Sequence, residues 1–120
     1  MKIAIAGATG LIGSRLAERL LDGGHCLILI SRGGGTGSRW PDRPEARHFQ
    51  LDLEREVPSA LLDGVDALVN LAGTRIRSGR WTRSHREEIR NSRINVTRNL
   101  VRALNVCRTP PAVFISASAT

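Results

Sequence analysis

Short apolar runs alternate with amphipathic stretches along the chain, and this alternation predicts strands and helices in turn. Continuous apolar runs at residues 2–6 and 26–30 predict two strands, and the second run is typical of a strand covered on both faces. Further strands are predicted at residues 47–51, 67–71 and 112–116. The order of elements predicts an α/β fold, a doubly wound parallel sheet of about five strands with helices on both faces.

Two longer helices and one short helix are predicted between these strands. Residues 11–21 form an amphipathic stretch that ends at Asp22-Gly23-Gly24, since glycine adopts the left-handed conformation that terminates helices. A long helix is predicted from Thr82 to Cys107, and residues 57–62 predict the short helix. The expected inner positions are Leu11, Ile12, Leu16, Leu20 and Leu21 in the first helix, and Ile89, Val96, Leu100, Ala103, Leu104 and Cys107 in the long one.

A glycine-rich turn, GATGLIG beginning at Gly7, joins the first strand to the first helix. Gly7 allows the tight turn, Gly10 lets the backbone approach a pyrophosphate, and Gly13 lets the helix pack close to the strand. The backbone N–H groups of Gly10, Leu11 and Ile12 are expected to point at the phosphates, where the helix dipole favours negative charge. The alternative is a glycine-rich turn that binds no ligand.

The end of the second strand indicates which dinucleotide this turn binds. An NAD site carries an acid there, which bonds the ribose 2′-hydroxyl, whereas an NADP site carries an arginine. Here the strand ends at Ser31-Arg32, and no acid follows before Asp42. We therefore predict NADP(H) in preference to NAD(H), with Ser31 and Arg32 holding the 2′-phosphate. The alternative is that Arg32 is a solvated loop residue.

Charge changes this picture in one region only. The chain has 120 residues and a formal net charge of +7. Ten arginines and two acids lie in residues 75–108, so this segment carries +8 and the rest of the chain is nearly neutral. Phosphate binding, nucleic-acid binding and a solvated face all remain open for it. The few aromatic residues do not interleave with the arginines, which argues against nucleic acid as a partner.

Several other classes of protein are excluded or disfavoured. No apolar run approaches the roughly 20 residues that span a bilayer, so no membrane association is expected. The opening strand is too short for a secretory signal, which favours a cytoplasmic location. The three histidines lack the spacing of metal ligands, so no metal site is expected. Cys26 and Cys107 lie in apolar stretches, which is typical of buried free thiols.

Several segments together resemble the extended short-chain dehydrogenase/reductase family. They are the opening IAIAGATGLIG, Asp52-Leu53, Asn70-Leu71-Ala72-Gly73, Asn95-Val96-Thr97 with Leu100, and Ser116-Ala117-Ser118-Ala119-Thr120. A narrower similarity, to epimerase-like proteins often labelled nucleoside-diphosphate-sugar epimerases, rests on Arg80-Trp81-Thr82, Ile89 and Ser92-Arg93. The resemblance covers the entire chain and implies a Rossmann-like NAD(P)-binding domain over residues 1–120.

The resemblance also implies roles for individual residues. Asp52 and Leu53 would border the adenine, or Asp52 would only cap the following turn. Asn95 would lie behind the active site, or would only satisfy a neighbouring carbonyl. Ser118 matches the family's catalytic serine, or is an ordinary residue at a strand end. The expected cofactor-binding residues are Gly7, Thr9, Gly10, Leu11, Ile12, Gly13, Ser31, Arg32, Asp52, Leu53, Leu71, Ala72 and Gly73.

One departure from the family's pattern concerns catalysis. The family's general acid/base is a tyrosine in a Tyr-x-x-x-Lys pair, where the lysine charge lowers the phenol pKa. This sequence has no tyrosine, and its only lysine is Lys2. No helix follows the strand ending at Ser116, so we expect the N-terminal part of a longer protein, whose later strands and substrate domain are absent here.

Two functions therefore remain open. The first is the dinucleotide-binding part of an NAD(P)-dependent epimerase or oxidoreductase that acts on an unidentified small molecule. The second is a non-catalytic NADP(H)-binding sensor or partner-binding module. The uncovered edge of the last strand further predicts that the isolated chain self-associates or is only marginally stable.

Overall fold

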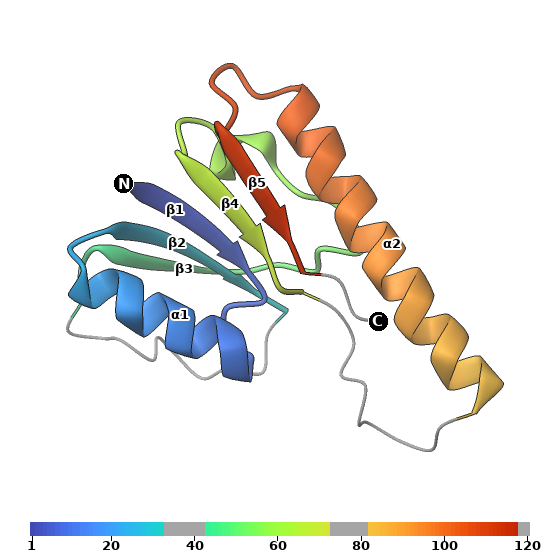
Figure 1. Cartoon of the computed structure of the whole chain (residues 1–120). Coiled ribbons are helices and arrows are strands. Elements are labelled where there is room, and N and C mark those ends of the chain that lie inside the picture. Colours follow the sequence, from blue (N-terminus) through green and yellow to red (C-terminus); the bar gives the residue numbers. More distant parts are fainter. Residues whose placement is uncertain (33–42, 73–81, 118–120) are drawn as a thin grey trace.

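The computed structural model describes residues 1–32, 43–72 and 82–117. Five parallel strands form one sheet in the order β3-β2-β1-β4-β5 (Figure 1). The strands are β1 (Lys2–Ala6), β2 (Cys26–Ser31), β3 (Ala46–Gln50), β4 (Ala67–Asn70) and β5 (Val113–Ser116). The helices are α1 (Leu11–Asp22), the one-turn 3₁₀ helix η1 (Ser59–Leu61) and α2 (Arg83–Asn105). The predicted Rossmann-like α/β fold is thus confirmed.

The sheet has a hydrophobic core on each face. Helix α1 packs on one face, and α2 packs on the other (Figure 1). On the α1 side, Ala17 and Leu21 pack with Ile5 and Leu29 of the two central strands. On the α2 side, the buried residues include Ala4, Ala6, Ile28, Ile30, Leu62, Leu68, Val96, Leu100 and Ala103. Five of the six β2 residues are buried, as predicted for a strand covered on both faces.

The inner stripe predicted for α1 is wrong at its first turn. Leu11 and Ile12 are 75% and 69% exposed, whereas Gly13, Ala17 and Leu21 are buried. Gly13, in the first turn of the helix, contacts the turn after β1. The residues that face the sheet are therefore Gly13 and those four and eight positions later, Ala17 and Leu21. The large side chains of the first turn are thereby left exposed to solvent.

The long helix α2 agrees better with its predicted stripe. Its buried residues include Ile89, Val96, Leu100 and Ala103. Its start is fixed by Thr82, whose hydroxyl accepts a hydrogen bond from the His85 N–H at 3.1 Å. Such a cap satisfies one of the backbone donors that the first turn leaves unpaired. Leu104 and Cys107 are only partly buried against the same core.

The expectation of two buried thiols is wrong for Cys26. Both cysteines are free, but Cys26 is exposed and Cys107 is half-buried. Cys26 occupies the first position of β2, the one residue of that strand that is exposed. In the part of the chain that the structure describes, no helix is long and apolar enough to cross a membrane. The same residues include no cluster of His, Cys, Asp and Glu that would hold a metal ion.

Candidate cofactor site

The carboxyl ends of the parallel strands meet at one edge of the sheet (Figure 1). From β1 the chain continues to β2 and β3 on one side, and later to β4 and β5 on the other. Open α/β sheets bind ligands at such a switch point, outside the carboxyl ends of the strands. Expected cofactor residues follow four of these ends: Gly7 after β1, Arg32 after β2, Asp52 after β3 and Leu71 after β4.

Two glycines of the turn after β1 are required by the packing of the protein itself. Gly7 has a φ of +82°, and a Cβ placed on it would lie 2.7 Å from the backbone nitrogen of Ala72. A Cβ on Gly13 would lie 2.4 Å from the Gly7 carbonyl oxygen. Both distances are shorter than any real Cβ contact, so these positions hold α1 and the end of β4 tightly against the turn.

Gly10 is different, because no neighbour among the described residues requires a glycine there. Its φ of −69° and ψ of 172° suit any residue. The nearest atom to a Cβ placed on it is the Gly7 carbonyl oxygen, at an ordinary 3.5 Å. The missing side chain instead leaves the backbone of the turn open to close approach from outside. Thr9, beside it, is half-buried.

The backbone donors of this turn differ in one respect from the expectation. The Gly10 N–H donates to the Gly7 carbonyl at 3.3 Å, so it is engaged within the turn. The N–H groups of Leu11 and Ile12 belong to the first turn of α1, which has no preceding helical carbonyl to bond. Gly10, the N-cap, supplies no side-chain acceptor, and the first turn carries no acid. These donors and the positive end of the helix dipole face the carboxyl edge.

Ser31 and Arg32, expected together at the 2′-phosphate, have different surroundings. Ser31 is 4% exposed, and its hydroxyl oxygen lies 2.6 Å from Nε2 of His48 on β3. Its side chain is therefore hydrogen-bonded to the neighbouring strand. Arg32 is 69% exposed and reaches Glu54 across the edge, with 3.7 Å between its Nη2 and Oε2 of the acid.

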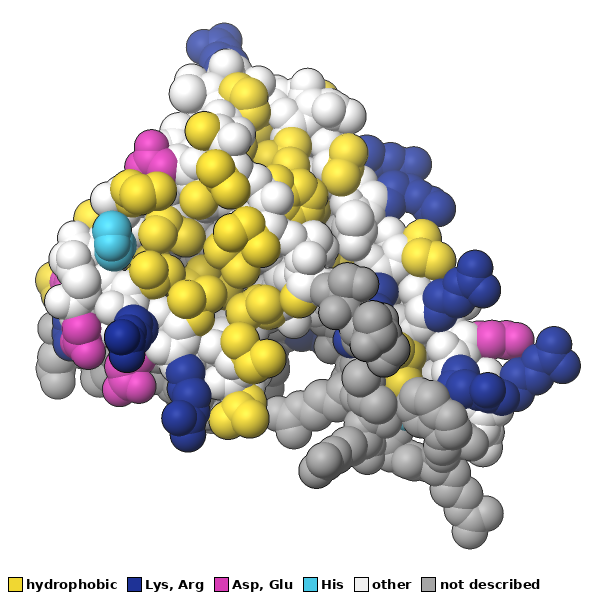
Figure 2. Space-filling view, viewed as in Figure 1, with side chains coloured by type: hydrophobic (Ala, Val, Ile, Leu, Met, Phe, Trp, Pro, Cys, Tyr) yellow, Lys and Arg dark blue, Asp and Glu magenta, His cyan; other side chains and the backbone are white. Residues whose placement is uncertain are grey.

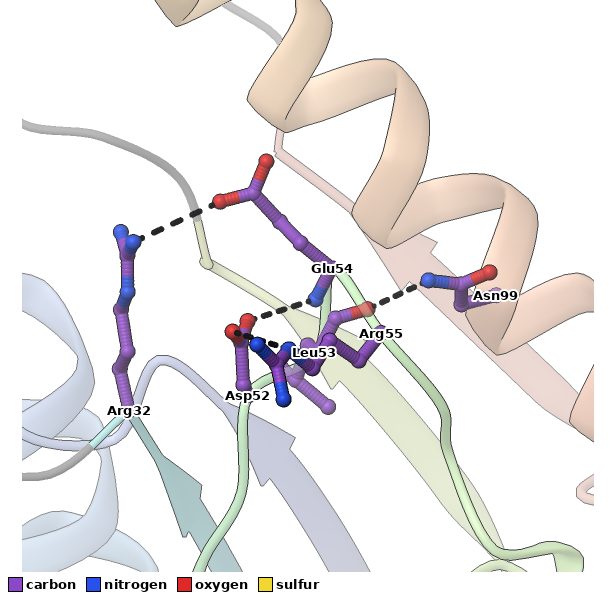
Figure 3. A network of polar contacts seen from close by, with 6 residues as sticks. All are labelled: Arg32, Asp52, Leu53, Glu54, Arg55 and Asn99. Atoms are coloured by element: carbon purple, nitrogen blue, oxygen red, sulfur yellow. Dashed lines mark hydrogen bonds and ion pairs between the residues drawn. The ribbon is translucent and has the colours of Figure 1, made fainter.

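The loop after β3 is shaped by Asp52. Its Oδ1 accepts a hydrogen bond from the Glu54 N–H at 3.0 Å (Figure 3). Its carbonyl accepts one from the Arg55 N–H at 3.1 Å. Asp52 thus caps the turn that follows, which is the structural alternative considered above. Leu53 is buried at 5% exposure.

Asn99 of α2 holds this loop from the other side and was missed by the sequence analysis. Its Nδ2 donates to the Leu53 carbonyl at 2.8 Å (Figure 3). The sequence analysis selected Asn95, one turn earlier and half-buried. A signal was present, because Asn99 continues the buried stripe of Val96 and Ala103, and a polar residue in such a stripe needs a partner.

Asn70 gives the end of β4 its shape. It is 4% exposed, its Oδ1 accepts a hydrogen bond from the Ala72 N–H at 3.1 Å, and its Nδ2 donates to the Ser116 hydroxyl at 3.2 Å. These bonds hold Leu71 and Ala72 beside Gly7. Gly73 and Ser118, also expected at the site, lie outside the described residues.

Part of the arginine-rich segment lies on the first half of α2. Arg83, Arg86 and Arg90 line a shallow depression together with Glu87. Arg83 and Glu87 form an ion pair of 3.5 Å between side chains that are 89% and 64% exposed. Exposed pairs of this kind contribute little to stability. Residues 75–80, which hold three more arginines, lie outside the described residues.

A model of the NAD dependent epimerase/dehydratase family matches residues 3–120. The chain belongs to this family. Epimerase family protein Mb2239 of Mycobacterium bovis is 38% identical over 117 residues, which cover 98% of this chain and 36% of that protein. Epimerase family protein YfhF of Bacillus subtilis is 34% identical over 119 residues, or 99% of this chain and 38% of that protein.

A solved structure extends the comparison. The crystal structure of human epimerase family protein SDR39U1 (isoform 2) with NADPH matches this chain with a TM-score of 0.74 and 28% identity. The match covers 100% of this epimerase-family chain and 37% of the human one. The chain therefore spans little more than a third of the length of these relatives. The resemblance to epimerase-like short-chain dehydrogenases is confirmed.

Proposed function

We propose that this chain is the dinucleotide-binding part of an NAD(P)-dependent epimerase or oxidoreductase, and that NADP(H) is its preferred cofactor. The observation that carries the proposal is the glycine-rich turn at the switch point of the sheet. Two of its glycines are required by packing, and the third, Gly10, leaves the backbone open where a pyrophosphate would approach. The NADPH in the structure of the human relative supports the same assignment.

Several other expected residues have places in this proposal. The N–H groups of Leu11 and Ile12 would bind the pyrophosphate, with Thr9 in the same turn. Arg32 is exposed at the end of β2, where a guanidinium binds the 2′-phosphate. The loop of Asp52 and Leu53 would border the adenine, and Leu71, Ala72 and Gly73 would run beside the other half of the cofactor.

The bound cofactor would supply hydride transfer, and this chain would bind and orient it. The sequence contains no tyrosine, so the proposed contribution of the chain does not include proton transfer by a phenol. Ser118 is the residue that we place against a small-molecule substrate. A cytoplasmic location belongs to the same proposal.

Titration with NADPH and then NADH, followed by nicotinamide fluorescence and thermal shift, tests this function. We expect micromolar binding of NADPH and weaker binding of NADH. In Arg32→Gln, NADPH affinity should fall by about tenfold or more and NADH affinity should hardly change, because a charge-assisted contact is lost. Arg55→Gln, which removes an exposed arginine of the neighbouring loop, is the matched control.

Two outcomes would contradict the proposal. Equal affinities for NADPH and NADH would remove the preference for NADP(H), and the absence of binding by the folded chain would remove the cofactor site. The second function is a non-catalytic NADP(H)-binding sensor or partner module, which would use the same dinucleotide site. A coding sequence that continues past Thr120 into a Tyr-x-x-x-Lys segment would decide for the enzyme.

A further inference from the structure

An acid faces the arginine that would hold the 2′-phosphate. Arg32 follows β2 and Glu54 lies in the loop after β3, with 3.7 Å between Nη2 and Oε2 (Figure 3). The two side chains are 69% and 29% exposed, respectively. An ion pair at such an exposed position is weak and is easily exchanged for another partner.

The backbone around Glu54 is anchored, so this acid stays near the end of β2. The Glu54 N–H donates to Asp52, and Asn99 of α2 bonds the carbonyl of Leu53, which precedes the acid. At the start of the loop, the Leu51 N–H donates a hydrogen bond to the Ser31 carbonyl at 2.8 Å. The loop is therefore tied both to α2 and to the end of β2.

Two other charged residues of this loop pair with each other. Asp52 faces Arg55, with 3.8 Å between Oδ2 and Nε. Among the described residues, Glu54 is the acid paired with Arg32. Any anion that binds the Arg32 guanidinium must therefore displace this carboxylate or accept its repulsion.

We propose that Glu54 is a specificity-determining residue of the cofactor site and that it opposes binding of the 2′-phosphate. This inference rests on the dinucleotide site proposed above. The 2′-phosphate of NADP(H) competes with Glu54 for Arg32 and is repelled by the same carboxylate. The 2′-hydroxyl of NAD(H) is neutral and is able to donate a hydrogen bond to it. Glu54 therefore lowers the preference for NADP(H) below the level that Arg32 alone would give.

The test compares Glu54→Gln with Glu56→Gln. The first variant removes the charge beside Arg32 and keeps the length of the side chain, and the second makes the same change at an exposed acid nearby. Affinities for NADPH and NADH are measured by nicotinamide fluorescence, and those for adenosine 2′,5′-bisphosphate and 5′-AMP by calorimetry. We expect Glu54→Gln to strengthen binding of both 2′-phosphorylated probes by about tenfold, with little change for the other two. Glu56→Gln should change all four affinities by less than about twofold.

The outcomes separate this inference from the function on which it rests. If the ratio of NADPH to NADH affinity is unchanged in Glu54→Gln, or changes equally in Glu54→Gln and Glu56→Gln, the role of Glu54 is refuted. The proposed dinucleotide site is not affected by that outcome. If wild type and Glu54→Gln bind neither dinucleotide while circular dichroism shows both folded, the dinucleotide site itself is refuted. Glu54→Ala provides a second variant with the same expected direction.

Discussion

The three glycines in the turn after β1 differ in what they do: two allow close packing within the protein, and one leaves the backbone accessible from outside. Gly7 and Gly13 are contact points between backbone segments, and each leaves no room for a methyl group. Gly10 leaves room for one and adopts an ordinary extended conformation. The described residues around Gly10 leave room for a side chain, so a requirement for glycine there would come from a ligand such as the proposed pyrophosphate.

Substitution by alanine should separate these purposes. Gly13→Ala is expected to lower the free energy of unfolding by about 2–3 kcal/mol, because a 2.4 Å contact with a carbonyl oxygen forces α1 away from the turn. Gly10→Ala should unfold at nearly the wild-type temperature but bind NADPH at least tenfold more weakly. Thermal unfolding and nicotinamide fluorescence measure the two effects. Wild-type affinity in a folded Gly10→Ala variant would contradict the assignment of the turn.

The two thiols differ in environment and should differ in reactivity. Burial raises the pKa of the Cys107 thiol above its ordinary value, with a smaller contribution from the Asp63 carboxylate. Its Sγ donates to the Ala103 carbonyl at 3.2 Å, as a protonated thiol does. A raised pKa leaves less thiolate at any given pH, so alkylation of the folded chain at pH 8 should modify exposed Cys26 first. Mass spectrometry of the time course measures this order, and equal rates would contradict it.

At the scale of elements, hydrophobic periodicity located every strand and both long helices to within two residues. It failed where a contact depends on small residues: α1 faces the sheet through Gly13 and Ala17, while the larger Leu11 and Ile12 are exposed. Periodicity weighs side chains by hydrophobicity and does not register how closely two backbones approach.

The candidate site was predictable in part: the motifs were found from the sequence, but the hydrogen bonds that shape their surroundings were not. Motif spacing places the glycine-rich turn and Arg32 at the carboxyl edge of the sheet, where the structure also has them. The bonds of Asn99 and Asn70 join residues far apart in the sequence, for example 46 positions between Asn99 and Leu53. Such partners are brought together by the packing of α2 and β5, so one sequence alone does not reveal them.

The link between α2 and the loop after β3 should be measurable. Asn99→Ala removes the donor to the Leu53 carbonyl and leaves a partly buried acceptor unpaired. We expect a loss of about 1–2 kcal/mol in the free energy of unfolding, and weaker dinucleotide binding because Asp52 and Glu54 lose their support. Asn95→Ala, one turn away on the same helix, is the control and should have a smaller effect on both. An equal effect of the two variants would show that the loop does not depend on Asn99.

At the scale of the molecule, the face of the sheet on which α1 packs is covered over one half and exposed over the other. Val113 and Ile115 of β5 are 47% and 55% exposed. They pair in register with Ala67 and Val69, which belong to the core on the α1 side. Helix α1 packs over the opposite half of this face, and hydrophobic side chains gather on the surface beside it (Figures 1 and 2). Contiguous apolar surface of this kind favours association.

The isolated chain is therefore expected to self-associate through the β4–β5 half of this face. Sedimentation velocity should show a mean mass that rises with protein concentration. Ile115→Lys should shift the distribution toward the monomer, whereas Ile94→Lys on α2, a similar change at a residue of 42% exposure, should not. A monomer at all concentrations, with a cooperative unfolding transition at high temperature, would contradict this expectation.

The position of β1 at the centre of the sheet has a consequence for folding during synthesis. Lys2 pairs with Cys26, and Ile3 pairs with Ala67, so the central strand bonds segments 24 and 64 residues later in the chain. A ribosome translating this chain releases β1 first, yet β1 lacks its second neighbour until β4 has emerged. Contacts of such long range slow folding and leave apolar strands uncovered in the meantime. The nascent chain thus carries its central strand unpaired on one side until β4 has emerged, which makes it a substrate for chaperones that bind short apolar segments.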